Sequence, residues 1–317
     1  MKRTLFLLII LTGALTGAAI GDVAEAEPGL VNPTIAEFNS YWYPNGAEIS
    51  RFTLDQARYG EIHKGDAVFI FVTESMIPGI QVKADRPDDG DIPILKLNAV
   101  RKFFTGIYPY SVMTSVFSPV DARNQPLPLK ITFSGQEWCG HVWAQLNLKE
   151  KTYRVESYSY FETEGDQGFT IEGAISEDAL WNRIRIAPAT LPEGRFQMIP
   201  GTLYSRFRHK GLTPLPAEAR LMAIRKRSLE GRPLTAYRIR MPQHDRTLVI
   251  FFETEFPHRI QGWKDTYPDG DRGGARRLTT RADRTHTLMT DYWNKNSNID
   301  RSLLKKLGVD WGNERLR

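Results

Sequence analysis

The sequence predicts a mainly β protein of the α+β class, with a large curved antiparallel sheet or open barrel and a few short helices. Short runs rich in β-branched and aromatic residues follow one another along most of the chain, joined by turn residues. No helical pattern long enough for a crossover recurs between these runs, which excludes a parallel sheet. The clearest strand signal is a hairpin at 136–167, whose two strands meet at the polar turn Lys149-Glu150-Lys151.

Residues 1–26 predict a cleavable secretion signal. Lys2 and Arg3 precede an apolar run at 5–20, and Ala24-Glu25-Ala26 offers a small-x-small cleavage site. No cysteine follows the run, so we expect no lipoprotein anchor, and no later run has the length of a membrane helix. We therefore expect a periplasmic or secreted protein without an integral membrane span after signal cleavage. Residues 27–317 should form a single antiparallel β-rich domain, with a sub-boundary near 188–202 if the chain divides further.

Helix and strand signals alternate unevenly in the first half of the chain. A short amphipathic helix is expected at 32–43, because Ile35, Phe38 and Trp42 lie at helical spacing before Pro44-Asn45-Gly46. Strands are expected at 47–62, 67–73, 92–104 and 110–120. The separators are a turn at 63–66, a polar loop at 85–91, a turn at 105–109 and a loop at 119–128.

After the hairpin, one short helix precedes a series of strands. Ser176 is the expected N-cap of a helix at 177–185, with Glu177 and Asp178 in its first turn. A loop-rich stretch at 188–201 leads to strands at 203–208, 218–228, 234–241, 248–254 and 258–266, and one more at 277–287. A closing helix at 301–307 ends at Gly308.

Composition narrows the classes of partner. The single cysteine allows no internal disulfide, so the fold must depend on its core. The net charge is +5, and no nucleic-acid-binding motif accompanies it, so we expect no nucleic-acid partner. Basic residues gather late in the chain, which favours a solvated face of strands and also permits contact with anionic lipid or polyanions. They are Arg220, Arg225, Lys226, Arg227, Arg232, Arg238, Arg240, Arg272, Arg276, Arg277, Arg281 and Arg284.

The first strand of the hairpin has two different faces, because side chains alternate across a strand. Val142, Ala144 and Leu146 point one way, with Leu148, and are expected to seal the core. The opposite face is expected to line a concave hollow, and its residues are Glu137, Cys139, His141, Trp143, Gln145 and Asn147.

Five segments of the mature chain carry a family resemblance: Y-W-Y-P-N-G-A-E-I, D-Q-A-R-Y-G-E-I-H-K-G-D-A-V, T-G-I-Y-P-Y-S-V-M-T-S-V-F, Q-E-W-C-G-H and Y-F-E-T-E-G-D-Q. The chain resembles a group of exported bacterial proteins of unknown function. The resemblance covers nearly its whole mature length and is clearest in these segments. Some members are labelled septum formation inhibitor Maf, which would imply a nucleotide pyrophosphatase. Maf proteins open with a Ser-rich, Arg-containing loop. Here a secretion signal and N-P-T-I-A-E-F stand in its place, so we do not transfer that activity.

A second resemblance is at the level of pattern. The segment L-T-A-Y-R-I-R-M-P-Q-H-D-R-T-L-V-I-F-F-E-T-E-F-P-H-R-I-Q-G-W is similar to successive strands of periplasmic lipoprotein-carrier-like incomplete barrels. This resemblance implies an open, curved sheet, and fold likeness alone does not imply function.

The favoured interpretation is a non-catalytic envelope protein of unknown function that binds an apolar or amphipathic ligand, such as a lipid, on the concave sheet. Aromatic and polar side chains together are typical of such a site. The expected ligand-binding residues are Trp143, Gln145, Tyr158, Tyr160 and Glu162. A structural module that binds another envelope protein during cell-wall assembly is a further interpretation.

The alternative is a thiol-dependent hydrolase or transferase. Cys139 would be the nucleophile and His141 its base, with their Cβ atoms roughly 6–7 Å apart on one strand face. Glu137 or Gln145, or Glu162 from the opposing strand, would orient the imidazole. Too few metal ligands lie near them for a zinc site. We expect no metal and no cofactor.

Overall fold

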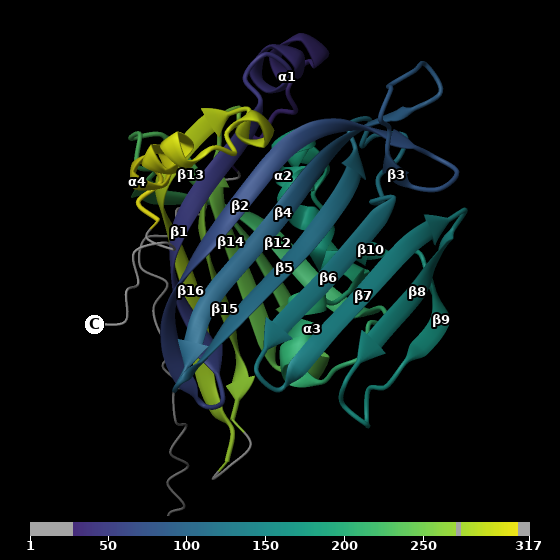
Figure 1. Ribbon diagram of the computed structural model, residues 1–317, viewed down its shortest axis with the longest axis vertical. Coiled ribbons are helices and arrows are strands. Elements are labelled where there is room, and N and C mark those ends of the chain that lie inside the picture. The colour runs from purple at the N-terminus through teal and green to yellow at the C-terminus, as the bar shows by residue number, and fades with distance from the viewer. Residues whose placement is uncertain (1–27, 271–273, 310–317) are drawn as a thin grey trace, which may run out of the picture.

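The computed structural model describes residues 28–270 and 274–309, and its described part is organised around one curved sheet of sixteen strands (Figure 1). The predicted signal at 1–26 lies outside the described residues. The strands are β1 (Ala47–Arg58), β2 (Glu61–Ile77), β3 (Val82–Lys83), β4 (Ile92–Thr105), β5 (Tyr108–Pro119), β6 (Lys130–Glu137), β7 (Gly140–Lys149), β8 (Thr152–Ser159), β9 (Gln167–Glu172), β10 (Ile175–Ser176), β11 (Gly194–Ile199), β12 (Leu215–Arg227), β13 (Pro233–Met241), β14 (Arg246–Glu253), β15 (Ile260–Asp269) and β16 (Arg276–Thr290). The α-helices are α1 (Ile35–Trp42), α2 (Glu177–Ile186), α3 (Thr202–Arg208) and α4 (Ser302–Lys306).

The sheet does not close into a barrel. Its order runs from β10 through β11–β16 to β1, β2 and β4–β9, while β3 pairs with β2. All these pairs are antiparallel except β10 with β11. Because β9 and β10 stand at the two ends of this order, the sheet stays open between them. The predicted fold class, a mainly β protein with a large curved antiparallel sheet and few short helices, is confirmed.

The first hairpin turns earlier than the sequence suggested. Arg58 pairs directly with Glu61, so the turn is Tyr59-Gly60, with both residues at positive φ, 56° and 79°. The predicted turn at 63–66 is therefore wrong, and those residues belong to β2. Gly65 has a different role, since a Cβ there would lie 2.2 Å from the carbonyl oxygen of Lys102 on β4. Its small size permits close strand approach.

The central hairpin is confirmed at its turn but wrong at its start. β7 and β8 meet at 150–151 as predicted. The stretch 136–139, however, is not the beginning of that strand, because β6 ends at Glu137 and the chain turns at Trp138-Cys139 into β7. Residues 130–135 of β6 were not assigned to any strand, and β11 lies within the predicted loop at 188–201.

The segment 203–208 is a helix, and its prediction as a strand was wrong. α3 begins at Thr202, and the backbone N–H groups of Gly201 and Thr202 donate to the carboxylates of Glu177 and Asp178, at 3.1 and 2.9 Å. Donors at a helix start need such acceptors. The contact that favours a helix here is thus supplied by residues 24 positions earlier in the chain.

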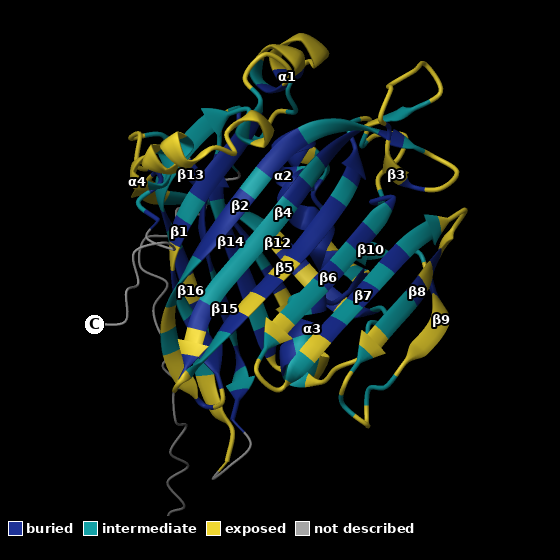
Figure 2. Cartoon of the chain, viewed as in Figure 1, coloured by how far each residue is buried: buried dark blue, intermediate teal, exposed yellow. Residues whose placement is uncertain are grey.

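The helix α2 lies inside the curve of the sheet (Figure 1). Its prediction is confirmed, with Ser176 as N-cap accepting from the Asp178 N–H at 3.2 Å. Trp181 packs edge-on against Phe69 of β2 and Trp263 of β15, with ring centroids 5.3 and 5.5 Å away. Figure 2 shows buried residues concentrated on the strands around the helix, whereas β9 is largely exposed. The core is therefore the space between the sheet and α2.

Buried polar bonds tie α2 to the sheet along its length. At its N-terminus, Arg246 of β14 donates to both Glu177 and Asp265, with distances of 2.7–2.8 Å. In its middle, Asn182 donates to the carbonyl oxygens of Leu95 and Val116 at 2.9 and 3.2 Å.

At its C-terminus, Arg185 binds both carboxylate oxygens of Glu48 on β1, at 2.6 and 2.7 Å. The side chains of Arg185 and Glu48 are only 0% and 1% exposed. A buried charge is tolerated only when it is paired and hydrogen-bonded.

The remaining helices agree with the sequence. α1 is capped by Thr34, which forms a capping box with Glu37, and α4 lies within the predicted closing helix. None of the helices in the described ranges has the length and apolar character needed to cross a membrane.

We expect Arg185→Met to lower the free energy of unfolding by about 3–5 kcal/mol, because it leaves the Glu48 carboxylate buried without its main partner. The double variant Arg185→Met/Glu48→Met should be less destabilised than the sum of the two single changes. Urea unfolding of the mature chain measures both. Arg154→Met, at an exposed ion pair on β8, is the control and should change stability by less than about 1 kcal/mol. Additive single effects would contradict the interpretation.

Candidate functional site

Cys139 lies in the β6–β7 turn and not on a strand. It is exposed, and its backbone N–H donates to the Glu137 carboxylate at 2.7 Å. His141 is also exposed, and the contacts of the described residues include no hydrogen bond between it and the thiol. The expectation that Cys139 and His141 share one strand face is wrong, because the chain reverses between Glu137 and Gly140.

The surroundings of the thiol oppose its ionisation. A hydrogen bond to Glu137, followed by slight desolvation and that carboxylate's charge, raises the pKa of Cys139. A catalytic thiol needs the opposite effect, which a neighbouring cation or base supplies. Glu137 therefore contacts the cysteine itself. It does not orient His141, which was its expected role in the thiol-dependent interpretation.

The two faces of β7 are separated as predicted, but the hollow lies on the other side. Val142, Ala144 and Leu146 are buried, and the last two belong to the same apolar cluster as Trp181 of α2. The even-numbered residues thus face the concave side of the sheet. The odd-numbered residues face outward, which corrects the expectation that they line the hollow.

The predicted ligand-binding residues consequently lie outside the hollow. Trp143 and Tyr158 pair across β7 and β8 on the outer face, with ring centroids 5.6 Å apart, and Gln145 donates to Asn147 at 2.6 Å on the same face. Tyr160 and Glu162 are exposed in the loop after β8.

A pocket of about 240 Å³ opens on the concave side of the same hairpin. Its apolar wall comes from β6, β7 and β9, through Phe133, Val142, Ala144 and Phe169. Its opposite wall is α3 and the residues that follow it. The pocket therefore lies at the open side of the sheet, where β9 has no strand on its free edge.

Charged side chains gather at the rim of this pocket. The Glu164 carboxylate, in the loop between β8 and β9, binds Arg206 through one oxygen and the Nδ1 atom of His209 through the other. The guanidinium of Arg206 also lies over the ring of Phe161, 4.6 Å from its centroid. Lys210 lines the same pocket and makes no ion pair within the described part of the chain.

The position of α3, and thus of this rim, depends on two carboxylates of α2. Glu177 and Asp178 accept from the first N–H groups of α3, as described above. Burial, followed by the negative charge of Glu177, raises the pKa of Asp178 to about 7. The Asp178 carboxyl is therefore only partly ionised at neutral pH, although it holds the start of α3.

Ser205 adds an unusual group to the pocket. The residue is 5% exposed and lines the cavity, and its Oγ has no hydrogen-bond partner among the described residues. Buried hydroxyl groups normally find a partner. The pocket thus offers one free polar group beside an apolar wall.

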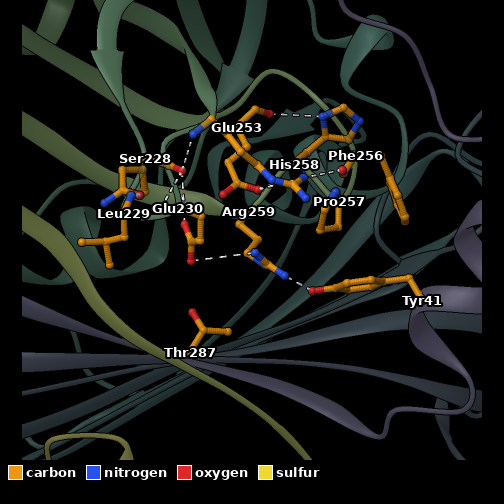
Figure 3. A network of polar contacts seen from close by, with 12 residues as sticks. Tyr41, Ser228, Leu229, Glu230, Glu253, Phe256, Pro257, His258, Arg259 and Thr287 are labelled. Atoms are coloured by element: carbon orange, nitrogen blue, oxygen red, sulfur yellow. Dashed lines mark hydrogen bonds and ion pairs between the residues drawn. The ribbon is translucent and has the colours of Figure 1, made fainter.

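A second group of charged residues lies near α1 (Figure 3). Arg259 lies between Glu230 and Tyr41, 3.8 Å from the Glu230 carboxylate and 3.4 Å from the Tyr41 hydroxyl. Glu253 is 0% exposed and lies 3.6 Å from Arg284. Arginine side chains surround the carboxylates of Glu230 and Glu253, and the residues of the cluster come from several turns. We therefore interpret this cluster as a structural junction between α1 and the ends of β12–β16.

A larger hollow of about 820 Å³ lies between α1 and the loops before β4 and after β5. Its walls are mainly loops, including 119–125, whereas the pocket beside α3 is built on strands and a helix. Sites on regular elements hold their geometry better. We therefore take the smaller pocket as the candidate site. The described residues contain no group of three or more His, Cys, Asp or Glu arranged to hold a metal ion.

Sequence reasoning missed the residues of α3 because it treated them as a strand. One signal was available: Thr202, Ser205, Arg206 and His209 follow a helical spacing and share the pocket. Glu164 was not among the predicted ligand-binding residues, although its neighbour Glu162 was.

No family model and no curated protein matches this chain. A structure described as a beta-barrel-like protein of domain of unknown function DUF1849 from Brucella abortus is similar, with a TM-score of 0.46 and 9% sequence identity. The match covers 77% of this chain and 97% of that chain. A similarity of this degree carries no argument about function, and the Maf label gains no support from it.

We expect the contribution of Asp178 to stability to fall as pH rises from about 4 to about 7. Its folded-state pKa is raised, so the folded chain holds a proton that the unfolded chain releases in this window. Asp178→Asn keeps an acceptor for the Thr202 N–H and removes the titration. Relative to the wild type, the variant should therefore gain stability with pH, by at most roughly 1.4 kcal/mol per pH unit.

Urea unfolding at a series of pH values measures this difference, with Asp89→Asn in the exposed loop before β4 as the control. Parallel pH profiles for wild type and Asp178→Asn would show that the carboxyl is not the titrating group.

Proposed function

We propose that the chain is an exported, non-catalytic envelope protein that binds an apolar or amphipathic ligand in the pocket beside α3. The observation that supports this most directly is the pocket's mixed lining. Phe133 and Val142 present apolar surface on one side, and Arg206 and Lys210 present charge on the other. Ligand sites are usually apolar hollows with a few polar groups that orient the ligand.

The topology supports entry from the side of the sheet. β9 is an edge strand, and the pocket touches its inner face through Phe169, which is 37% exposed. An elongated ligand can therefore reach the apolar wall without separating paired strands. The concave surface deeper in the sheet is already filled by α2, so this end of the hollow is where a ligand meets accessible apolar surface.

The thiol-dependent alternative receives less support from the geometry. Cys139 has a raised pKa, lies outside the pocket and contacts Glu137 instead of a base. The expected effect of Cys139→Ala on ligand binding is accordingly small. A module that binds another envelope protein is still a separate proposal, for which no contact of the described residues gives specific support.

We expect Ser157→Trp to weaken binding of the neutral apolar probe N-phenylnaphthylamine by about tenfold, or about 1.4 kcal/mol. Ser157 lines the pocket and is half-buried, so an indole would occupy the space next to Ala144. Probe fluorescence measures binding. Glu156→Trp is the matched control, because the neighbouring residue faces the opposite side of β8 and should leave affinity within about twofold. Equal effects, or no binding by the wild type, would contradict the proposal.

The proposed export predicts the N-terminal residue of the mature protein. The protein recovered from the periplasm or medium should begin at Glu27, directly after Ala26 of the proposed cleavage site. Mass spectrometry of the intact protein measures this end. A chain lacking residues 2–26 should stay in the cytoplasm. Recovery of the full-length chain from the cytoplasm would contradict export.

A further inference from the structure

The rim of the pocket beside α3 carries more positive than negative groups. Arg206 and Lys210 are cationic, and His209 adds a further positive charge when it is protonated, whereas Glu164 is the one carboxylate among the lining residues. Glu164 binds Arg206 and His209 at once, and Lys210 has no carboxylate partner within the described residues. The lining residues therefore carry more cations than carboxylates, and Arg206 and His209 are already arranged around the Glu164 carboxylate.

The contacts of Glu164 indicate which chemical group of a ligand these cations can bind. Its carboxylate comes from the loop between β8 and β9, whose residues Tyr160, Glu162 and Thr163 are exposed. The Arg206 side chain is 12% exposed, so a guanidinium of low exposure here depends on an anion beside it. A ligand carboxylate or phosphate can meet the same cations, because charge-assisted hydrogen bonds to arginine accept either group.

Ser205 supplies an independent observation. Its Oγ is buried, lines the pocket and lacks a partner in the part of the chain that the structure describes. A hydroxyl donor in the same cavity as two cationic side chains suits a head group that carries several acceptor oxygens. The apolar wall of Phe133, Val142 and Ala144 lies in the same cavity, so a ligand that also carries an apolar chain can contact this wall as well as the cations.

We infer that the pocket selects an amphiphile with an anionic head group, a carboxylate or a phosphate, and an apolar chain. This inference rests on the proposed binding function and specifies its ligand class. The head group would bind Arg206, Lys210 and Ser205 in competition with Glu164, and the chain would cover the apolar wall.

Calorimetry with the mature protein tests the inference, using ligands below their micelle concentration. Dodecanoate should bind about tenfold more tightly than dodecanol, which has the same chain without charge. Inorganic phosphate and acetate, which have no chain, should give no measurable binding. Higher ionic strength should weaken dodecanoate binding and leave dodecanol unchanged.

Variants of the rim residues test which side chains cause the preference for an anionic head group. Lys210→Gln and Arg206→Gln should each weaken dodecanoate binding by about tenfold, and each should weaken dodecanol binding much less, because dodecanol carries no charge. Glu164→Gln should strengthen dodecanoate binding several-fold by removing the competing carboxylate, whereas a purely structural role for Glu164 predicts a loss. Arg154→Gln, which removes the same charge from the outer face of β8, is the matched control and should change neither ligand.

The possible results separate the inference from the proposed function. Equal affinity for dodecanoate and dodecanol would overturn the anionic selectivity and leave the binding function standing. Binding of phosphate as tight as that of dodecanoate would show a site for a free anion, and would overturn the inference. Failure of dodecanoate, dodecanol and N-phenylnaphthylamine alike would overturn the proposed function itself.

Discussion

The contact between α2 and the inside of the sheet is the constraint on which the rest of the structure depends. Two buried arginines, Arg246 and Arg185, fix the two ends of the helix to β14 and β1. These pairs contribute position more than net stability, because removing charges from water costs about what their attraction returns. The pair of Arg246 and Glu177 also affects the candidate site. The carboxylate of Glu177 binds Arg246 and the first turn of α3 together, so the helix that fills the core also places the helix that lines the pocket.

Much of the fold could be predicted because burial in a sheet repeats every two residues. The strands after residue 215 and the helix α2, with its cap at Ser176, follow directly from such local patterns. The turns that were misplaced depend on distant neighbours. Gly65 looked like a turn residue, but its small size is needed where β4 approaches, which only the paired strand reveals. α3 has seven residues, and its start is satisfied by carboxylates from another helix, so local propensity could not identify it.

The candidate site shows a similar division. Alternation in β7 correctly separated Val142 and Ala144 from His141 and Trp143, because the period depends on the strand alone. Which set faces the hollow depends on where α2 packs, and the sequence of β7 contains no information about that. The aromatic pair of Trp143 and Tyr158 suggested a ligand surface, yet it covers the outside of the sheet. The pocket instead joins segments distant in sequence, from 133 to 212.

The edge position of β9 has a consequence for how the pocket admits a ligand. β9 pairs only with β8, and the chain passes to β10 through Gly173 and Ala174, where Gly173 donates to the Lys151 carbonyl oxygen at 2.7 Å. A side chain at Gly173 would collide with that oxygen, so this end of β9 is held closely. The other end continues into the loop that carries Glu164. Fraying of β9 should therefore begin at the end beside the pocket and stop at Gly173, which widens the mouth of the pocket. The amide protons of the inner strands should stay protected from exchange.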